Sequence, residues 1–474
     1  MQSQSSPPPP AHWWTEPSPP APATGEPSWL ILDRFVHRST NETPGVVDGD
    51  ATTSEIAHEC VGRPIRASLR IADPPAVSRL YLHWSGRPEI DRCSEPVVIA
   101  AHRSSILFRL AVPFEDPMHW DRTFWFPHDY FVYSCSSSPP SLALLPPCFD
   151  GGLTDPKLDS LFRPHRWQQQ RTMIDRQMGI LCHGDKGEFT VADLEHHSKQ
   201  EVELCLLHHP PPASSHVSVE WSVKRLQVPA DMKINLNSWQ TDVVVPIGGR
   251  CLCWVDYYQG MLLVDVLTVN NSRLHYIPLP SSKDLKSRRV YIDGDPDPFR
   301  CLSVSDAGIF KFVCILTKEH PSPHPFTIAT WTLVDIHHGR WEKDGKITMG
   351  ASEFFGLYAA QSYLPRVRPS FPVVSLVDPD IICFLLEDKG RNLFWIVQVN
   401  MRSKLLQSSA RYINVEEEEE EEGFPAKSDI WKRFIGHYFI RSNFSSYLSE
   451  DAITSRKLSE VMQKVKEGRM MQKE

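Results

Sequence analysis

The chain has 474 residues, of which 41% are hydrophobic and 10% aromatic, so it is long enough to bury a large core. Its formal charge of -8 rests on the consecutive glutamates at 416–422. The remainder is close to neutral and lacks the basic field that nucleic acid or an anionic membrane attracts. The eleven cysteines show no repeated CxxC spacing. The chain also has neither a signal-peptide pattern nor an apolar stretch of ~20 residues, which excludes a secreted or membrane-spanning class. We therefore expect an intracellular protein, cytoplasmic or nuclear.

Residues 1–27 contain nine prolines among Ser, Gln and Ala. Such a segment buries too little apolar surface to offset chain entropy, and the sequence therefore predicts a disordered Pro-rich leader. Trp13 and Trp14 within it are either a short docking element or incidental. The ordered part is predicted to begin near Trp29, with a strand over 30–36.

Short strands separated by Pro, Asp and Ser turns follow from residue 65. They are predicted at 66–71, 78–84, 97–101, 106–112, 131–134 and 142–145. A helix is predicted over 155–163, between these strands and the rest of the chain.

From residue 179 the chain repeats one unit of apolar strand, Gly or Asp turn, apolar strand, turn and strand. Copies lie at 179–207, 251–280, 301–334 and 373–412. A spacing of roughly 40 to 60 residues suits the blades of a β-propeller. The sequence therefore predicts a mainly β protein with about six small antiparallel blades over 28–412, closed into a ring when the strand at 30–36 completes the last blade. A β-sandwich is the structural alternative.

The segment 251–280 is the clearest copy, because bulky and β-branched residues flank a tight turn. Gly260 can adopt the positive φ that such a tight turn needs. A third strand over 274–279 ends at Pro278 and Pro280, which are tolerated at strand ends and edges.

Four motifs carry a family resemblance: WVDYYQG at 254–260, LHYIPLP at 274–280, SWLILDRFVHR at 28–38 and VSLVDPDIICFLL at 374–386. Together they resemble a large plant family, expanded in grasses, catalogued as domain of unknown function sixteen-eighteen. The resemblance extends from Trp29 to about Tyr412 and implies no activity. Members look like the propeller domains that follow F-box modules in ubiquitin-ligase adaptors, although no F-box helices precede Trp29.

The C-terminal part is predicted to contain an acidic linker at 413–427 and a helical tail at 428–474. The linker includes the glutamates at 416–422, which repel one another and suit a solvated spacer or, alternatively, a basic partner. Apolar residues of 430–439 recur at spacings of three and four, the pattern of an amphipathic helix.

Three kinds of residue cluster suggest ligand sites but fit structural roles better. The histidine pairs at 196–197, 208–209 and 337–338 cannot each chelate one ion on a strand, because neighbouring side chains point to opposite faces. Cys251 and Cys253 share a face, where core packing is favoured over a metal or redox role. The acid clusters at 293–297 and 378–380 match inter-strand turns as well as cation ligands, and the turn interpretation is favoured.

No motif for a nucleophile elbow, a phosphate-binding loop or a zinc protease occurs. We therefore predict no catalytic residue, no metal ligand and no cofactor. The leading hypothesis is a non-enzymatic scaffold that binds a protein partner of unknown identity, with the oligomeric state left open. The alternatives are a ubiquitin-ligase substrate receptor and an enzyme with Asp and His residues in a central channel. Several strongly shifted carboxyl groups in that channel would favour the enzyme.

Overall fold

The computed structural model describes residues 29–38, 52–84, 96–112, 128–149, 171, 173–184, 187–196, 198, 200–209, 220–229, 232, 234–268, 274–280, 298–317, 326–388, 390–391, 393–412 and 437–443. The predicted leader at 1–27, the helix at 155–163, the acidic linker at 413–427 and most of the tail at 428–474 lie outside these residues. None of the helices described is long and apolar enough to cross a membrane.

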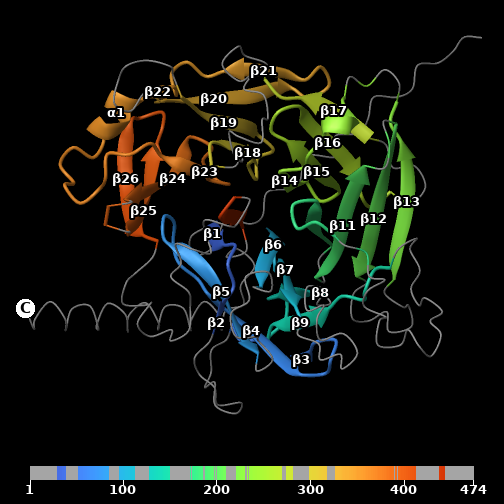
Figure 1. Ribbon diagram of the computed structural model, residues 1–474. Coiled ribbons are helices and arrows are strands. Elements are labelled where there is room, and N and C mark those ends of the chain that lie inside the picture. The colour runs from blue at the N-terminus through green and yellow to red at the C-terminus, as the bar shows by residue number, and fades with distance from the viewer. Residues whose placement is uncertain are drawn as a thin grey trace, which may run out of the picture.

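Six small sheets surround a common axis and form a six-bladed β-propeller (Figure 1). The first blade combines strands from both ends of the chain: β27 (Phe439–Ser442), β1 (Leu30–Asp33), β5 (Val77–Trp84), β4 (Pro64–Arg70), β3 (Ala57–His58) and β2 (His37–Arg38). The second blade contains β6 (Val97–His102), β7 (Ser105–Ala111), β8 (His128–Ser134) and β9 (Ser141–Leu144). The third contains β10 (Met178–His183), β11 (Glu188–His196), β12 (Glu201–His209) and β13 (Trp221–Gln227).

The remaining blades are arranged in chain order. The fourth consists of β14 (Val243–Ile247), β15 (Cys251–Asp256), β16 (Gly260–Asp265) and β17 (Leu274–Pro278). The fifth consists of β18 (Arg300–Val304), β19 (Phe310–Thr317), β20 (Phe326–Asp335), β21 (Arg340–Lys343) and β22 (Met349–Gly350). The sixth consists of β23 (Ser370–Val374), β24 (Ile381–Asp388), β25 (Leu393–Asn400) and β26 (Leu405–Arg411). A 3₁₀ turn, η3 (Leu236–Ser238), precedes the fourth blade, and α1 (Ala351–Gly356) follows β22.

The strands are apolar on both faces because each blade packs between two others. Six hydrophobic clusters each join residues of two neighbouring blades, and one of them places Trp254 of the fourth blade among Leu181 and Leu206 of the third. Buried faces on both sides explain continuous apolar runs such as β15, where every residue is buried. The core is therefore a ring of inter-blade layers.

The innermost strand of each blade lines the axis. These strands are β27, β6, β10, β14, β18 and β23, and each is adjacent to the next around the ring. Residues at the ends of these strands or just after them, including His102, Ile247, Val304 and Ser442, surround one end of the central channel. We call this side of the propeller the strand-end face.

The ring closes differently from the sequence prediction. The strand near Leu30 lies in the first blade, where β1 pairs parallel with β5 and antiparallel with β27. Closure comes instead from β27, which the sequence assigned to a helical tail beyond the propeller. The apolar residues near Phe439 lie on a strand, where Phe439 packs against Tyr412 with ring centroids 5.0 Å apart. The propeller thus extends past the predicted boundary at 412.

Most strands predicted between 66 and 412 are present within a few residues of their expected bounds. The six-blade prediction is confirmed, and the sandwich alternative is wrong. The sequence missed β13, β14 and β21. It also missed α1, in which Phe354 is fully buried between the fifth and sixth blades.

Candidate functional site

The segment around Trp254 has a structural role. Trp254 is fully buried, and its indole Nε1 donates a 2.7 Å hydrogen bond to the backbone oxygen of Gln177. Its cluster also contains Val264, as the sequence predicted. The side chain therefore joins the third and fourth blades and is unavailable to a partner.

The turn after Trp254 is held by a set of carboxylate and tyrosine contacts. Asp256 accepts hydrogen bonds from the backbone amides of Gln240 and Tyr258, at 2.9 and 2.8 Å. The Tyr257 backbone oxygen accepts a 2.7 Å bond from Arg300, whose guanidinium lies 4.3 Å from the Tyr258 ring centroid. The motif residues therefore fix the fourth blade to the fifth.

Gly260 is needed for a reason other than the one predicted. It is absent from the described glycines with positive φ, so the turn prediction was wrong on this point. A Cβ at Gly260 would lie 2.5 Å from the Ile277 backbone oxygen and 2.5 Å from the Tyr276 ring. Close approach of β17 therefore requires the glycine.

Two adjoining cavities follow the central axis. The cavity at the strand-end face encloses about 670 Å³ of empty space, counted out to open solvent, and the inner one about 600 Å³. Ala101, Val245, Pro246 and Arg441 line both. The central channel is therefore the site where groups from several blades converge on one space.

Opposite charges line the outer cavity. Arg441 donates from Nη2 to the Leu302 backbone oxygen at 3.0 Å, while its Nη1 is buried without an acceptor among the described residues. Asp306 is positioned by a 2.9 Å bond from its backbone amide to the Leu376 oxygen. Burial raises the pKa of the Asp306 carboxyl above its usual range, and the Arg441 charge acts in the opposite direction.

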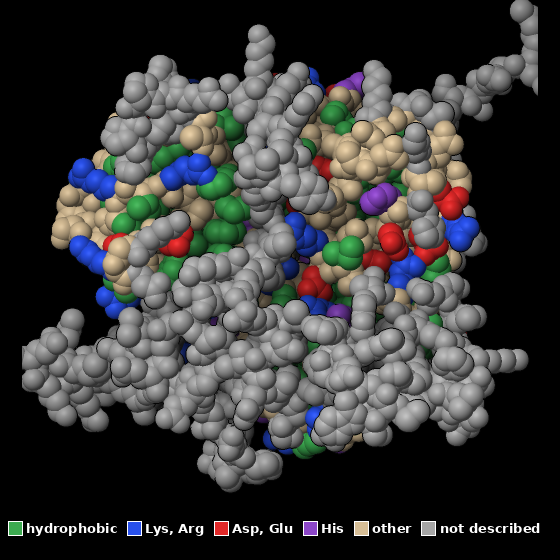
Figure 2. Space-filling view, in the orientation of Figure 1, with side chains coloured by type: hydrophobic (Ala, Val, Ile, Leu, Met, Phe, Trp, Pro, Cys, Tyr) green, Lys and Arg blue, Asp and Glu red, His purple; other side chains and the backbone are tan. Residues whose placement is uncertain are grey.

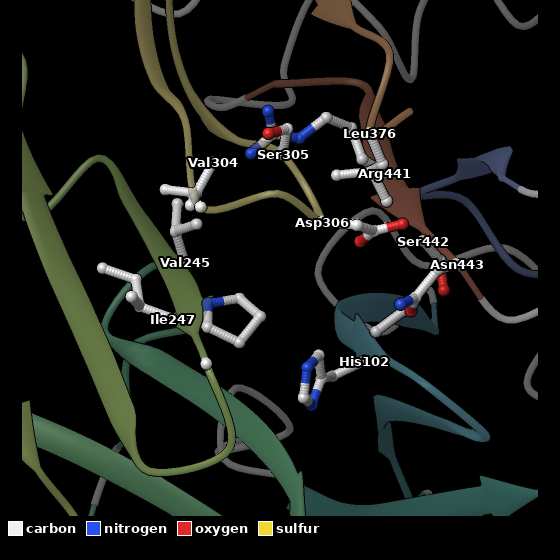
Figure 3. Close-up of a pocket in the computed structure, with 14 residues that line it drawn as sticks. His102, Val245, Ile247, Val304, Ser305, Asp306, Leu376, Arg441, Ser442 and Asn443 are labelled. Carbon is white, nitrogen blue, oxygen red and sulfur yellow. The ribbon is translucent and has the colours of Figure 1, made fainter. Parts of the chain in front are cut away.

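His102 also lines this cavity as a neutral donor. Its Nδ1 accepts a 2.8 Å hydrogen bond from the Cys182 amide, so the ring proton is on Nε2. Burial, assisted by His183, lowers the pKa of His102 to about 4. In Figure 3, His102, Asp306 and Asn443 point into the same space from different segments, opposite the apolar Val245 and Ile247.

One comparison with known proteins bears on the family of this chain. Residues 254–383 match the model of a family described as "Protein of unknown function (DUF1618)". No curated protein matches the chain. The matched part begins at Trp254 and includes the predicted motifs at 254–260 and 274–280 and most of the motif at 374–386, but it excludes the motif at 28–38.

The solved structures with some likeness to this chain have low similarity to it. An alpha-L-arabinofuranosidase from Fusarium graminearum is 8% identical over 68% of this chain and 94% of its own, with a TM-score of 0.28. An alpha-L-arabinanase from Penicillium chrysogenum is 7% identical over 66% and 90%, with a TM-score of 0.25. The hemagglutinin-neuraminidase of Parainfluenza Virus 5 is 7% identical over 78% and 90%, with a TM-score of 0.26. Values this low carry no argument about fold or function.

The described residues of the clusters singled out in the sequence do not line the two channel cavities. His338 pairs with Asp335 at 2.8 Å in an exposed turn, while His208 shares Thr190 with His183 at 2.8 and 2.9 Å. His209 stacks on Phe189, with ring centroids 4.5 Å apart. His197 and the acids at 293–297 lie outside the described residues.

The cysteine pair and the remaining acid cluster have structural contacts. Cys251 and Cys253 are fully buried in one apolar cluster, where burial raises both thiol pKa values. Asp378 accepts the Asp380 amide at 2.9 Å, as in a turn. Asp380 in turn pairs with the buried Lys311 at 2.9 Å.

Two groups of ionisable residues were missed in the sequence because their members come from distant segments. Glu59, Cys60 and Asp129 have ligand atoms within 4.8 Å of one another. The Glu59 carboxylate, however, already accepts the Val61 amide at 2.6 Å, and Asp129 accepts the Cys60 amide at 2.6 Å. These bonds explain the cluster as a turn anchored to β8, and burial raises the pKa of Asp129 to about 6.

The second group surrounds Arg171. Its guanidinium bonds Glu203 and, at 2.7 Å, Glu195, and lies 3.7 Å from Asp193. Burial raises the pKa of Asp193 to about 7. Asp193 and Asp129 are thus the strongly shifted carboxyl groups among the described residues, and neither lines the channel cavities.

Proposed function

We propose that the protein is a non-enzymatic interaction scaffold whose strand-end face binds a protein partner. The observation that carries this proposal is a pair of exposed apolar side chains on turns beside the channel. Ile309 is 39% exposed and Val377 is 53% exposed. We call these two residues the rim pair.

The rim pair is held on rigid turns. Ser305 Oγ accepts the Ile309 amide at 3.1 Å, and Ser375 Oγ accepts the Val377 amide at 3.2 Å. The bond from the Asp306 amide to Leu376 joins the two turns. A surface that is ordered before binding loses little entropy when a partner docks, which favours affinity.

The charge distribution fits a protein partner better than nucleic acid. Among the described residues visible in Figure 2, basic and acidic side chains are interspersed. A protein interface centres on a few apolar anchors surrounded by polar groups, whereas nucleic acid requires a continuous basic surface.

The enzymatic alternative predicted several shifted carboxyl groups in the channel. Among the described residues, Asp306 is the carboxylate that lines its two cavities. The ubiquitin-ligase role and the plant origin stay predictions of the sequence.

The scaffold proposal is tested by capturing partners from an extract of the source organism on immobilised full-length chain. The double variant Ile309→Ser/Val377→Ser is compared with Leu405→Ser, a matched control on β26 that removes a 61% exposed leucine. We expect one partner to be lost with the double variant and retained with the control. The purified partner should then bind the double variant at least about tenfold more weakly. Equal capture by all three chains would contradict the proposal.

A further inference from the structure

We propose that the outer cavity of the channel binds a zwitterionic α-amino acid with an apolar side chain, held between Arg441 and Asp306. This inference goes beyond the scaffold function, since it concerns a small ligand inside the channel. It rests on two charges of opposite sign, two neutral donors and an apolar wall that share one space.

Arg441 supplies the site for the carboxylate. It lines the cavity, and one of its terminal nitrogens has no acceptor among the described residues. A guanidinium binds a carboxylate strongly because both groups are planar and charged. That nitrogen has almost no accessible surface, so a ligand carboxylate would interact with the guanidinium charge from the cavity side.

Asp306 supplies the site for the ammonium group. Within the described part of the chain, its carboxylate makes neither a hydrogen bond nor an ion pair, including with Arg441. The two opposite charges therefore share one cavity and attract each other without a direct ion pair. A ligand with an anionic and a cationic group can complement both.

His102 and Asn443 supply neutral donors. Because His102 Nδ1 accepts the Cys182 amide, its Nε2 proton remains for a ligand. Asn443 accepts the Arg103 amide through Oδ1 at 3.1 Å, so its amide NH₂ also remains. Both residues line the cavity and can donate to a carboxylate.

The opposite wall selects an apolar side chain. Val245, Ile247 and Val304 are 4%, 2% and 8% exposed, and they line the cavity together with Leu376. An aliphatic side chain placed there would remove apolar surface from water.

The proposal is tested by titrating the purified full-length chain with L-leucine in a calorimeter. Four comparison ligands each lack one element: 4-methylpentanoate has no ammonium, 3-methylbutylamine has no carboxylate, glycine has no apolar side chain, and inorganic phosphate is an anion alone. We expect leucine to bind and each comparison ligand to bind at least about tenfold more weakly.

Two variants assign the site. Arg441→Gln and Asp306→Asn should each weaken leucine binding at least about tenfold, because each removes one charge partner. The matched controls Arg340→Gln and Glu342→Gln change one charge of each sign in an exposed pair on β21 and should bind leucine normally. If Arg441→Gln does not fold, Asp306→Asn, a near-isosteric change at a partly exposed residue, decides the result.

Three outcomes would overturn the proposal. The first is no heat of binding with leucine up to about 10 mM. The second is leucine binding that neither variant weakens, and the third is phosphate binding with the same affinity as leucine. None of them involves a protein partner, so failure here and failure of the scaffold proposal are distinguishable.

Discussion

At the scale of single residues, the side chains that matter most to this propeller are buried between blades. Trp254 shows this: its ring fills the layer between the third and fourth blades, and its indole bonds Gln177. Burial of the Asp193 carboxyl, in contrast, lowers stability wherever that group is ionised, because burial disfavours its charged form. The two residues lead to separate predictions about stability.

Trp254→Ala removes a fully buried aromatic side chain and leaves the Gln177 oxygen without its donor. We expect the free energy of unfolding to fall by about 3 to 5 kcal/mol. Denaturant unfolding followed by circular dichroism measures the change. Trp341→Ala, which removes a partly exposed tryptophan bonded to the Pro278 oxygen, should cost less. An unchanged midpoint for Trp254→Ala would show that the ring has no structural role.

Asp193→Asn tests the buried carboxyl near Arg171. The folded chain keeps the Asp193 proton up to a pKa of about 7, whereas the unfolded chain loses it near the ordinary aspartate pKa of 3.8. Between these values the unfolded state binds fewer protons, so the contribution of Asp193 to stability falls as pH rises. Asparagine does not titrate, and the variant should therefore gain stability relative to the wild type between pH 5 and pH 8.

Thermal melting of both chains at the two pH values measures this relative change. The amide keeps an oxygen near Arg171 and differs from the wild-type side chain mainly in that it does not titrate. A difference in melting temperature that is the same at pH 5 and pH 8 would mean that Asp193 is ionised in the folded chain.

At the scale of single elements, closure of the ring depends on the short strand β27. Its four residues pair with β1 from Leu30↔Ser442 to Asp33↔Phe439 and complete the inner ring. Without β27, the first blade would expose the edge of β1, and β6 and β23 would lose the strand between them. An unpaired edge exposes backbone groups and favours aggregation.

Two truncations separate the contribution of this strand from that of the C-terminal residues beyond it. A chain that ends at residue 443 retains β27, and a chain that ends at residue 436 lacks it. We expect cooperative melting from the first and a lower, broader transition with aggregation from the second. Calorimetry and light scattering provide the measurements. Indistinguishable melting of the two chains would show that β27 does not close the ring.

At the scale of the whole molecule, closure couples every blade to two neighbours. The six apolar clusters form a continuous ring, which differs from an open repeat array with free ends. We therefore expect a single calorimetric transition, with equal calorimetric and van't Hoff enthalpies. Phe384→Ala, in the layer between the fifth and sixth blades, should lower the temperature of that one transition. A second transition, leaving the other blades folded, would contradict this coupling.

The sequence by itself determined most of the strands between residues 66 and 412 and the approximate number of blades. Apolar runs such as 251–256 and their recurrence depend on local spacing, which a single segment records. The same local evidence identified Cys251 and Cys253 as core residues and the acids near Asp380 as turn residues.

Only the tertiary structure decided which strand closes the ring and which residues share the channel. Residues near Phe439 have a spacing that fits either a helix or a buried strand, and pairing with β1, about four hundred positions earlier, selects the strand. His102, Asp306 and Arg441 have no common motif, since they come from three blades and meet only at the axis. Spacing along the chain records local geometry, whereas a site on the axis of a closed ring depends on the packing of every blade.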